Sequence, residues 1–410
     1  MSAQAASHLA PAAFLAAAIA CLLLVVRRGR AWPLVALALL GTTSAWWATN
    51  APLQRLYALG PSADRVMNLA LCQVVAAGNS PLRTSQVGQL HFEPFWGLLV
   101  AALSGWNPDR VLALYPWLPL LVSWGIALAV YVGLGTPRPA GTGEPWFSPW
   151  ERALAALFGV LLWSAPLDYT GSYRDPWAMT VLLKPNHALG LVVFPLLLRL
   201  FAAVRGWRGR VAAGLVLHLL AWVFVLHMAY VALGLVLFAA WSLAARRPEA
   251  RREATDVAVA LAVNVLIVSP YLVMLLVGYP FLQRLAIMTI PAHSPHLLET
   301  TARAGVVFAL GAWGALVCAR RGRGGRLWAA QFAAAHLVWV AYLALSLLQV
   351  ARERDEVVYW TRFLNAVLAG IGAWDLATRA AAALPALLGP PSRRAVAIAA
   401  LALPFALPLW

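Results

Sequence analysis

Three charged residues, far apart in the chain, have side chains suited to moving a proton and holding an anion: Asp64, Lys184 and Arg362. Asp64 follows the turn-forming Gly60–Ser62 and precedes Val66–Ala77, whose apolar spacing predicts a helix. A carboxylate at that position can accept a proton from a hydroxyl group, or it can cap the helix N-terminus. Lys184 is the only lysine, and Arg362 lies just inside an apolar run. Either side chain can hold a phosphate or anchor the chain at a membrane surface.

The segments that must position these residues are strongly apolar. Hydrophobic residues make up 62% of the 410 residues and charged residues 11%, which is about half of the charged fraction of a soluble domain. Apolar runs of about 17–25 residues recur along the chain, and each is long enough to span a membrane as a helix. The net charge of +16 does not indicate nucleic-acid binding, because the arginines lie in short clusters between these runs. We therefore predict an all-α, polytopic integral membrane protein.

The apolar runs predict about twelve transmembrane helices in a single transmembrane domain, residues 1–410. Residues 9–48 contain the first two spans, residues 49–110 a large loop with interfacial helices, and residues 111–410 the remaining spans. The loop includes Phe92–Ser104, which is too short to span and predicts a helix lying at the interface. The approximate cores of the spans are Leu9–Val26, Ala31–Ala48, Val111–Leu134, Ala153–Ala165, His187–Val204, Val211–Val225, Met228–Ala245, Val257–Val277, Ala302–Ala319, Leu327–Gln349, Val358–Ala377 and Ala395–Trp410.

Arginine clusters fall on one side of the predicted spans and orient the chain. They are Arg27/Arg28/Arg30, Arg205/Arg208/Arg210, Arg246/Arg247/Arg251/Arg252, Arg320/Arg321/Arg323/Arg326 and Arg393/Arg394. Together with the single arginines Arg138, Arg152, Arg199 and Arg379, this side carries about 20 of the 31 basic residues, and arginine-rich loops stay cytoplasmic. The loop at residues 49–110 is then extracytoplasmic.

Further polar residues fall on the predicted extracytoplasmic side, beside the first three. Those that we consider as candidate site residues are His91, Glu93, Arg174, Asp175, His187 and His227. Charged groups near membrane depth are costly and usually face a cavity or a partner. We therefore predict that these residues line one outward-facing cavity, which contains both acidic and basic side chains. For any single residue, a solvated loop charge or an interfacial anchor is the alternative.

The cysteines and histidines do not indicate a metal site. Cys21, Cys72 and Cys318 are odd in number and widely spaced, which argues against a disulfide framework or a metal cluster. His293 and His296 are three residues apart in a Pro-broken segment, a weak pattern for a pair of ligands. A divalent metal is possible but not indicated.

The layout resembles that of the GT-C glycosyltransferases, polytopic enzymes that use polyprenyl-phosphate sugars at the extracytoplasmic face. Four segments carry the resemblance: ADRVMNLALCQVVAAGNSPL with Asp64, the interfacial HFEPFWGLLVAALSG, KPNHALGLVVFPLLLRL with Lys184, and RERDEVVYWTRFLNAVLAGIGAWDL with Arg362. The third segment leads into a predicted hairpin of short helices that turns near His227. The first loop of the family often carries two acids together or one residue apart, whereas here the acid after Asp64 is Glu93.

The resemblance implies inverting transfer of a sugar from a polyprenyl-phosphate donor to an extracytoplasmic glycan, lipid or protein acceptor, in a bacterial inner membrane. Asp64 would be the general base, and Lys184, Arg362 and Arg174 would hold the donor phosphate. The residues left to position the acceptor or the sugar are Glu93, His91, Asp175, His187 and His227. It implies no required cofactor and no nucleic-acid partner.

Other functions fit parts of the same pattern. A secondary transporter or lipid flippase would need polar residues at mid-membrane and broken helices in related halves, whereas the charges here gather at one face. A non-catalytic subunit of a cell-envelope glycan assembly system is a further alternative, favoured by the missing acid pair. A polysaccharide polymerase or ligase that acts on undecaprenyl-diphosphate substrates would be an enzyme with the same layout.

Overall fold

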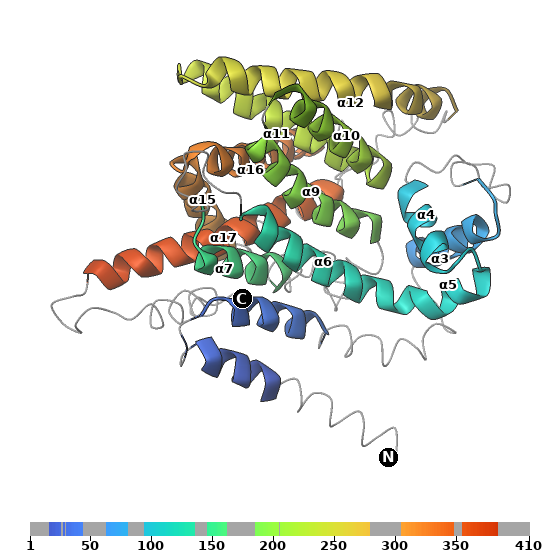
Figure 1. Ribbon diagram of the computed structural model, residues 1–410, viewed down its shortest axis with the longest axis horizontal. Coiled ribbons are helices and arrows are strands. Elements are labelled where there is room, and N and C mark those ends of the chain that lie inside the picture. The colour runs from blue at the N-terminus through green and yellow to red at the C-terminus, as the bar shows by residue number, and fades with distance from the viewer. Residues whose placement is uncertain are drawn as a thin grey trace.

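The protein is built from helices (Figure 1). The computed structural model describes residues 16–25, 28, 30–43, 63–80, 94–135, 146–161, 185–204, 206–278, 305–347 and 355–383, and every regular element within them is helical. This confirms the all-α prediction. The helices are Ala16–Val25, Trp32–Thr43, α3 (Ala63–Ala76), α4 (Pro94–Leu103), α5 (Pro108–Leu114), α6 (Leu118–Gly133), α7 (Pro149–Leu161), α9 (Pro185–Ala203), α10 (Gly206–Val223), α11 (Val225–Ala244), α12 (Ala250–Gly278), α15 (Gly305–Ala319), α16 (Gly322–Leu347) and α17 (Asp355–Ala383).

Two of the described helices are long and apolar enough to cross a membrane. They are α11, Val225–Ala244, and the Ala250–Val273 part of α12. Several others are equally apolar but shorter, among them Leu120–Gly133 in α6 and Gly305–Ala319. The number of about twelve spans therefore stays a prediction, and its last member, Ala395–Trp410, lies outside the described residues.

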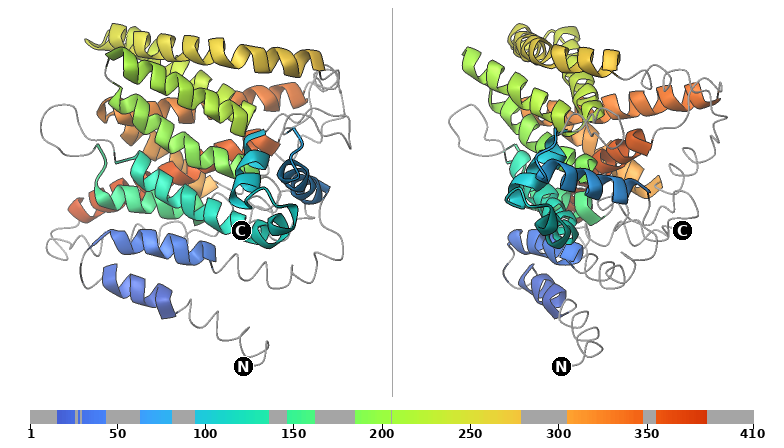
Figure 2. Two further views of the ribbon diagram at one scale, coloured as in Figure 1. Left: turned by 45° about the vertical axis from the view of Figure 1, so that its right-hand side comes forward. Right: turned by 90° about the vertical axis from the view of Figure 1, so that its right-hand side faces the viewer.

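The longer helices pack side by side, with α17 near the centre (Figures 1 and 2). Helix α17 packs against α7, α15 and α16, while α9 packs on α6 and α10 on α12. Glycines allow the closest of these approaches: a Cβ atom on Gly314 of α15 would overlap the Leu368 carbonyl oxygen of α17. Small residues at helix contacts are typical of transmembrane bundles.

The predicted span Val111–Leu134 is wrong as a single helix. The chain forms α5, then a 3₁₀ turn at Tyr115–Trp117, and then α6. Pro116 and Pro119 explain the break, because proline lacks a backbone N–H and its ring clashes with the preceding helical turn. Helix α5 begins after Asn107, whose side chain accepts hydrogen bonds from the backbone N–H groups of Asp109 and Arg110.

The predicted helical hairpin exists, and its turn lies at Phe224, three residues before His227. Helix α10 ends at Val223, Phe224 is extended with φ −164° and ψ 108°, and α11 begins at Val225. The His227 backbone N–H donates to the Phe224 carbonyl at 3.1 Å, so His227 belongs to the first turn of α11. His227 is thereby held inside the bundle rather than at a solvent-facing turn.

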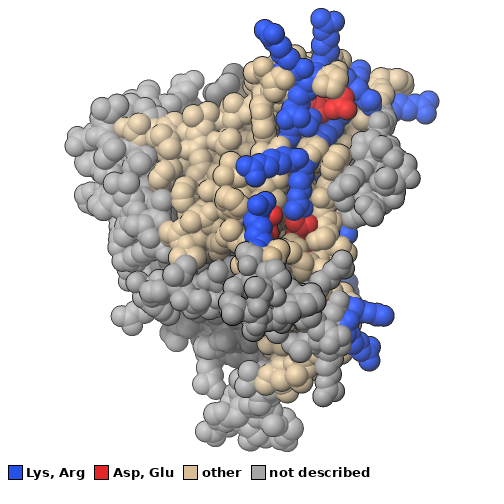
Figure 3. Space-filling model, turned by 90° about the vertical axis from the view of Figure 1, so that its left-hand side faces the viewer, with Lys and Arg blue, Asp and Glu red and all other residues tan. Residues whose placement is uncertain are grey.

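The bundle has two distinct ends. Helices α3, α4 and α5 pack together at the right-hand end in Figure 1, where α4 also contacts α10. Their contact is close: a Cβ atom on Gly97 of α4 would lie 3.2 Å from Val75 Cγ2 of α3. Figure 3 views the left-hand side, where Arg side chains gather with acidic side chains among them.

Candidate functional site

His227 lies where the starts of α9, α11 and α17 meet. Its side chain is 1% exposed and packs on the aromatic rings of Phe224 and Trp360, each with ring centroids 4.7 Å away. On the α9 side it lies directly against Gly190, where a Cβ atom would overlap the imidazole Nδ1. Phe194, one helical turn further along α9, also contacts Trp360, with 4.5 Å between ring centroids. His227 and Trp360 thus hold three helix starts in one place.

Replacing Gly190 by Ala is expected to destabilise the fold by about 1–3 kcal/mol, because the new methyl group would force the buried His227 ring to move. Thermal unfolding of the purified protein measures the change. Gly305→Ala is the matched control, since a Cβ atom there meets nothing within 4 Å. Equal unfolding temperatures for Gly190→Ala and the unaltered protein would show that His227 is not tightly held.

Two of the predicted site residues, Lys184 and His187, lie in the sequence directly before and just after the start of α9. The helix begins at Pro185, because the fixed φ of proline suits the first position of a helix. His187 lies in its first turn, three residues before Gly190, and the structure describes its backbone only. Lys184 directly precedes the helix and lies outside the described residues. The α9 backbone therefore leads from the Lys184 position to the His227 contact within two helical turns.

Arg362 lies on α17, two residues after Trp360. It is half-buried, and its Nε and Nη2 atoms are among the buried nitrogens. Thirteen residues separate it from Asp375 at the other end of the same helix, which is about 20 Å at about 1.5 Å per residue. Arg362 thus lies at nearly the same level of α17 as Trp360 but on a different helix face, and well away from the arginine-rich end.

A polar strip that we did not predict continues from Arg362 into the bundle. Asn365 is 8% exposed; its Nδ2 donates to the Thr361 carbonyl at 2.9 Å and lies 3.3 Å from His336 Nε2 on α16. His336 Nδ1 lies 2.8 Å from the Phe332 carbonyl, so Nδ1 carries the proton and Nε2 accepts from Asn365. The signal in the sequence was the spacing of four between Thr361 and Asn365 in an apolar run, which puts both on one helix face.

Asp64 lies in the first turn of α3, which begins at Ala63, three residues before the predicted start at Val66. The structure describes its backbone but not its side chain. Helix α3 packs on α4 and α5, and Gln73 Nε2 of α3 donates to the Pro108 carbonyl at 3.5 Å. Asp64 is therefore at the α3–α5 end of the bundle (Figure 1). The remaining candidates, His91, Glu93, Arg174 and Asp175, lie outside the described residues.

Buried ion pairs join the helices at the opposite, arginine-rich end. Asp256 of α12 accepts from Arg210 Nε at 2.7 Å and from Arg323 Nη2 at 2.8 Å. Glu253, one turn earlier, pairs with Arg326 at 2.5 Å, and both side chains are almost fully buried. These contacts link α10, α12 and α16. The prediction that these arginine clusters share one side agrees with this geometry.

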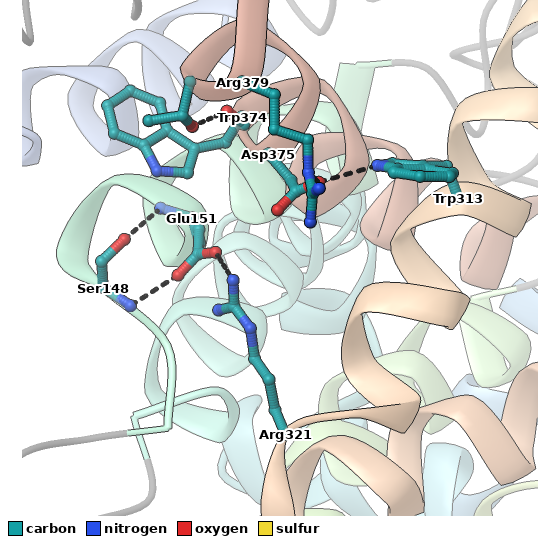
Figure 4. A network of polar contacts seen from close by, with 8 residues as sticks. Ser148, Glu151, Trp313, Arg321, Trp374, Asp375 and Arg379 are labelled. Carbon is teal, nitrogen blue, oxygen red and sulfur yellow. Dashed lines mark hydrogen bonds and ion pairs between the residues drawn. The ribbon is translucent and has the colours of Figure 1, made fainter. Parts of the chain in front are cut away.

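A second set of contacts at this end surrounds Glu151 (Figure 4). Ser148 and Glu151 form a capping box at the start of α7: the Ser148 N–H donates to Glu151 Oε2 at 2.8 Å, and the Glu151 N–H donates to Ser148 Oγ at 3.3 Å. Arg321 pairs with the other carboxylate oxygen at 2.5 Å. Burial lowers the pKa of Arg321, but the hydrogen bond and charge of Glu151 outweigh it, and the net pKa is raised. The Ser-x-x-Glu pattern of residues 148–151 was visible in the sequence.

Neither cysteines nor metal ligands form a site in the described part of the chain. Cys21, Cys72 and Cys318 are free thiols. Burial raises the pKa of Cys72 on α3 to about 12, so that thiol stays uncharged and unreactive. Among the described residues, no three His, Cys, Asp or Glu side chains are grouped as metal ligands would be.

Comparison with known proteins adds no relative. No protein-family model matches the chain, and no curated protein matches it.

Proposed function

We propose that the chain is a polytopic protein of a bacterial inner membrane, with about twelve spans. Helices α10 and α12 expose large hydrophobic side chains on their outer faces: Leu266 is 76% exposed, Val265 59% and Leu215 47%. Such faces suit lipid tails. Because arginine-rich ends stay in the cytoplasm, the end that bears α3, α4 and α5 is then extracytoplasmic.

At that extracytoplasmic end the protein transfers a sugar from a polyprenyl-phosphate donor to a glycan, lipid or protein acceptor. The observation that carries this proposal is the contact of His227 with Gly190 and Trp360. Because this contact brings the starts of α9, α11 and α17 together, it supports one site formed by residues of these three helices. Arg362 of α17 and Lys184, which directly precedes α9 in the sequence, are basic groups that suit the phosphate of a lipid-linked donor.

In the proposed reaction Asp64 accepts the proton of the acceptor hydroxyl while that oxygen attacks the anomeric carbon. The bond between the anomeric carbon and the phosphate oxygen breaks, polyprenyl phosphate leaves with the electron pair, and the configuration inverts. Lys184, Arg362 and Arg174 stabilise the charge that develops on the phosphate. The residues left to position the sugar or the acceptor are His91, Glu93, Asp175 and His187, whereas the buried His227 packs between α9 and α17. The reaction needs no metal, because a phosphate is already a good leaving group.

A lipid flippase or transporter is a second candidate, favoured by polar side chains within the helices. Gln331 of α16 is fully buried and donates to the Val231 carbonyl, and Asn264 of α12 is 2% exposed. Transport sites typically lie at such mid-helix depth. Reconstituted vesicles distinguish the two functions: a flippase moves a labelled polyprenyl-phosphate lipid across the bilayer without consuming it.

Replacing Arg362 by Gln is expected to lower sugar transfer about 100-fold, because one group that stabilises the departing phosphate is lost. The assay uses the purified full chain, a radiolabelled polyprenyl-phosphate sugar and membrane-lipid acceptors. The matched control is Arg251→Gln, which removes an exposed arginine from the opposite end and should leave transfer unchanged. Transfer at the unaltered rate in Arg362→Gln would remove Arg362 from the site, and no transfer by the unaltered protein with any donor would overturn the proposed function.

A further inference from the structure

The arginine-rich end has an inner layer of paired arginines and an outer layer of exposed ones. The inner layer pairs with buried carboxylates and consists of Arg210, Arg321, Arg323 and Arg326. The outer layer consists of Arg208, Arg246, Arg251, Arg252 and Arg320, all exposed. Within the described ranges no ion pair joins any of these five to a carboxylate. Among the described residues, the outer layer therefore presents positive charge that is not paired with a carboxylate.

The inner pairs hold the outer arginines in one patch. Asp256 joins the start of α10 through Arg210 and the start of α16 through Arg323. Arg208, Arg252 and Arg320 each lie within about one helical turn of one of these three residues. Three chain segments thus bring their exposed arginines together, and Figure 3 shows basic side chains gathered over this end.

Exposed apolar surface adjoins the patch. Trp207 is 68% exposed beside Arg208, whose guanidinium carbon lies 5.9 Å from the Trp207 ring centroid. Leu243 at the end of α11 is 48% exposed, and Leu215, two turns into α10, is 47% exposed. Charge at the helix ends and apolar side chains along the helix sides match the order of headgroups and tails in a phospholipid layer. A soluble polyanion would cover the charge and leave the apolar faces in water.

We propose that this outer arginine patch binds the headgroups of anionic phospholipids, such as phosphatidylglycerol, in preference to zwitterionic ones. The tails of the bound lipids lie along the exposed sides of α10, α11 and α12. This proposal rests on the membrane location but not on sugar transfer, so either can fail without the other. The bound lipids hold the cytoplasmic end of the protein at a defined depth in the membrane.

Native mass spectrometry of the full chain in detergent tests the proposal, with phosphatidylglycerol and phosphatidylcholine titrated separately. The unaltered protein should bind phosphatidylglycerol more tightly. An arginine near an anionic surface contributes about fivefold in affinity, so the double variant Arg251→Gln/Arg252→Gln should lose about 25-fold for phosphatidylglycerol at low ionic strength. Its affinity for phosphatidylcholine should not change.

The control variant Arg83→Gln/Arg110→Gln removes the same charge from the segment that precedes α6. It should bind phosphatidylglycerol as the unaltered protein does. Equal affinities of the unaltered protein for the two lipids would overturn the proposal, as would an equal loss in both variants. Displacement of phosphatidylglycerol by an equal concentration of glycerol 1-phosphate would also overturn it, because the patch would then bind soluble phosphate rather than lipid.

Discussion

Replacing Arg326 by Met is expected to destabilise the folded protein by about 3–5 kcal/mol. The Arg326 and Glu253 side chains are 4% and 2% exposed, and their nitrogen and oxygen atoms lie 2.5 Å apart. Removing the arginine leaves the Glu253 carboxylate buried without its partner, far from water that could solvate it. Met keeps most of the length and apolar surface of the side chain, including its contact near the Phe238 ring, so lost packing contributes little.

Two further variants test whether the loss of stability in Arg326→Met comes from the buried, unpaired charge. Arg379→Met breaks the Arg379–Asp375 pair, whose arginine is 59% exposed, and should cost less than about 1 kcal/mol. The double variant Glu253→Gln/Arg326→Met removes both charges and should recover most of the lost stability. Equilibrium unfolding in a detergent titration measures all three. An equal cost for Arg326→Met and Arg379→Met would show that burial does not govern the strength of these pairs.

Local sequence signals predicted the helix starts well. Pro185 begins α9, and the turn residues before Asp64 are followed by α3. The short apolar segment at residues 92–104 contains α4. Each of these signals acts within a few residues, through a fixed φ or a local apolar pattern, so it can be read without knowing the fold. The break at Pro116 was equally local, and the span prediction missed it because hydropathy averages over the whole run.

Contacts between helices could not be predicted from one sequence. The pairing of Glu253 with Arg326 joins residues 73 apart in the chain, and many other arginines were available to that glutamate. His227 illustrates the same limit within the candidate site. Its residue type marked it as polar and accessible, yet the close approach permitted by Gly190 puts it in a buried aromatic cluster. The same holds for Asp64 and Arg362, because contacts between helices decide whether residues so far apart in the sequence come together.

Replacing Asp64 by Asn is expected to lower sugar transfer by about 10²–10⁴-fold, the usual contribution of a positioned general base. Asn has the same shape but cannot accept the proton of the acceptor hydroxyl. The fold should persist, because the residue lies in the first turn of α3, where loss of the charge costs about 0.3–1 kcal/mol. Transfer from a radiolabelled polyprenyl-phosphate sugar is measured beside thermal unfolding, so that lost activity and lost structure are separated.

Asp109→Asn is the matched control for Asp64→Asn. Asp109 is an exposed acid in the first turn of α5, at the same end of the bundle and in the same position relative to its helix. Its replacement changes the same charge beside a helix N-terminus and should leave transfer intact. Unchanged activity in Asp64→Asn would refute its role as the base and direct the same experiment to Glu93, the next acid in the sequence. Equal losses in both variants would point instead to the electrostatic field of the α3–α5 end, because two carboxylates in different helices cannot both be the single proton acceptor.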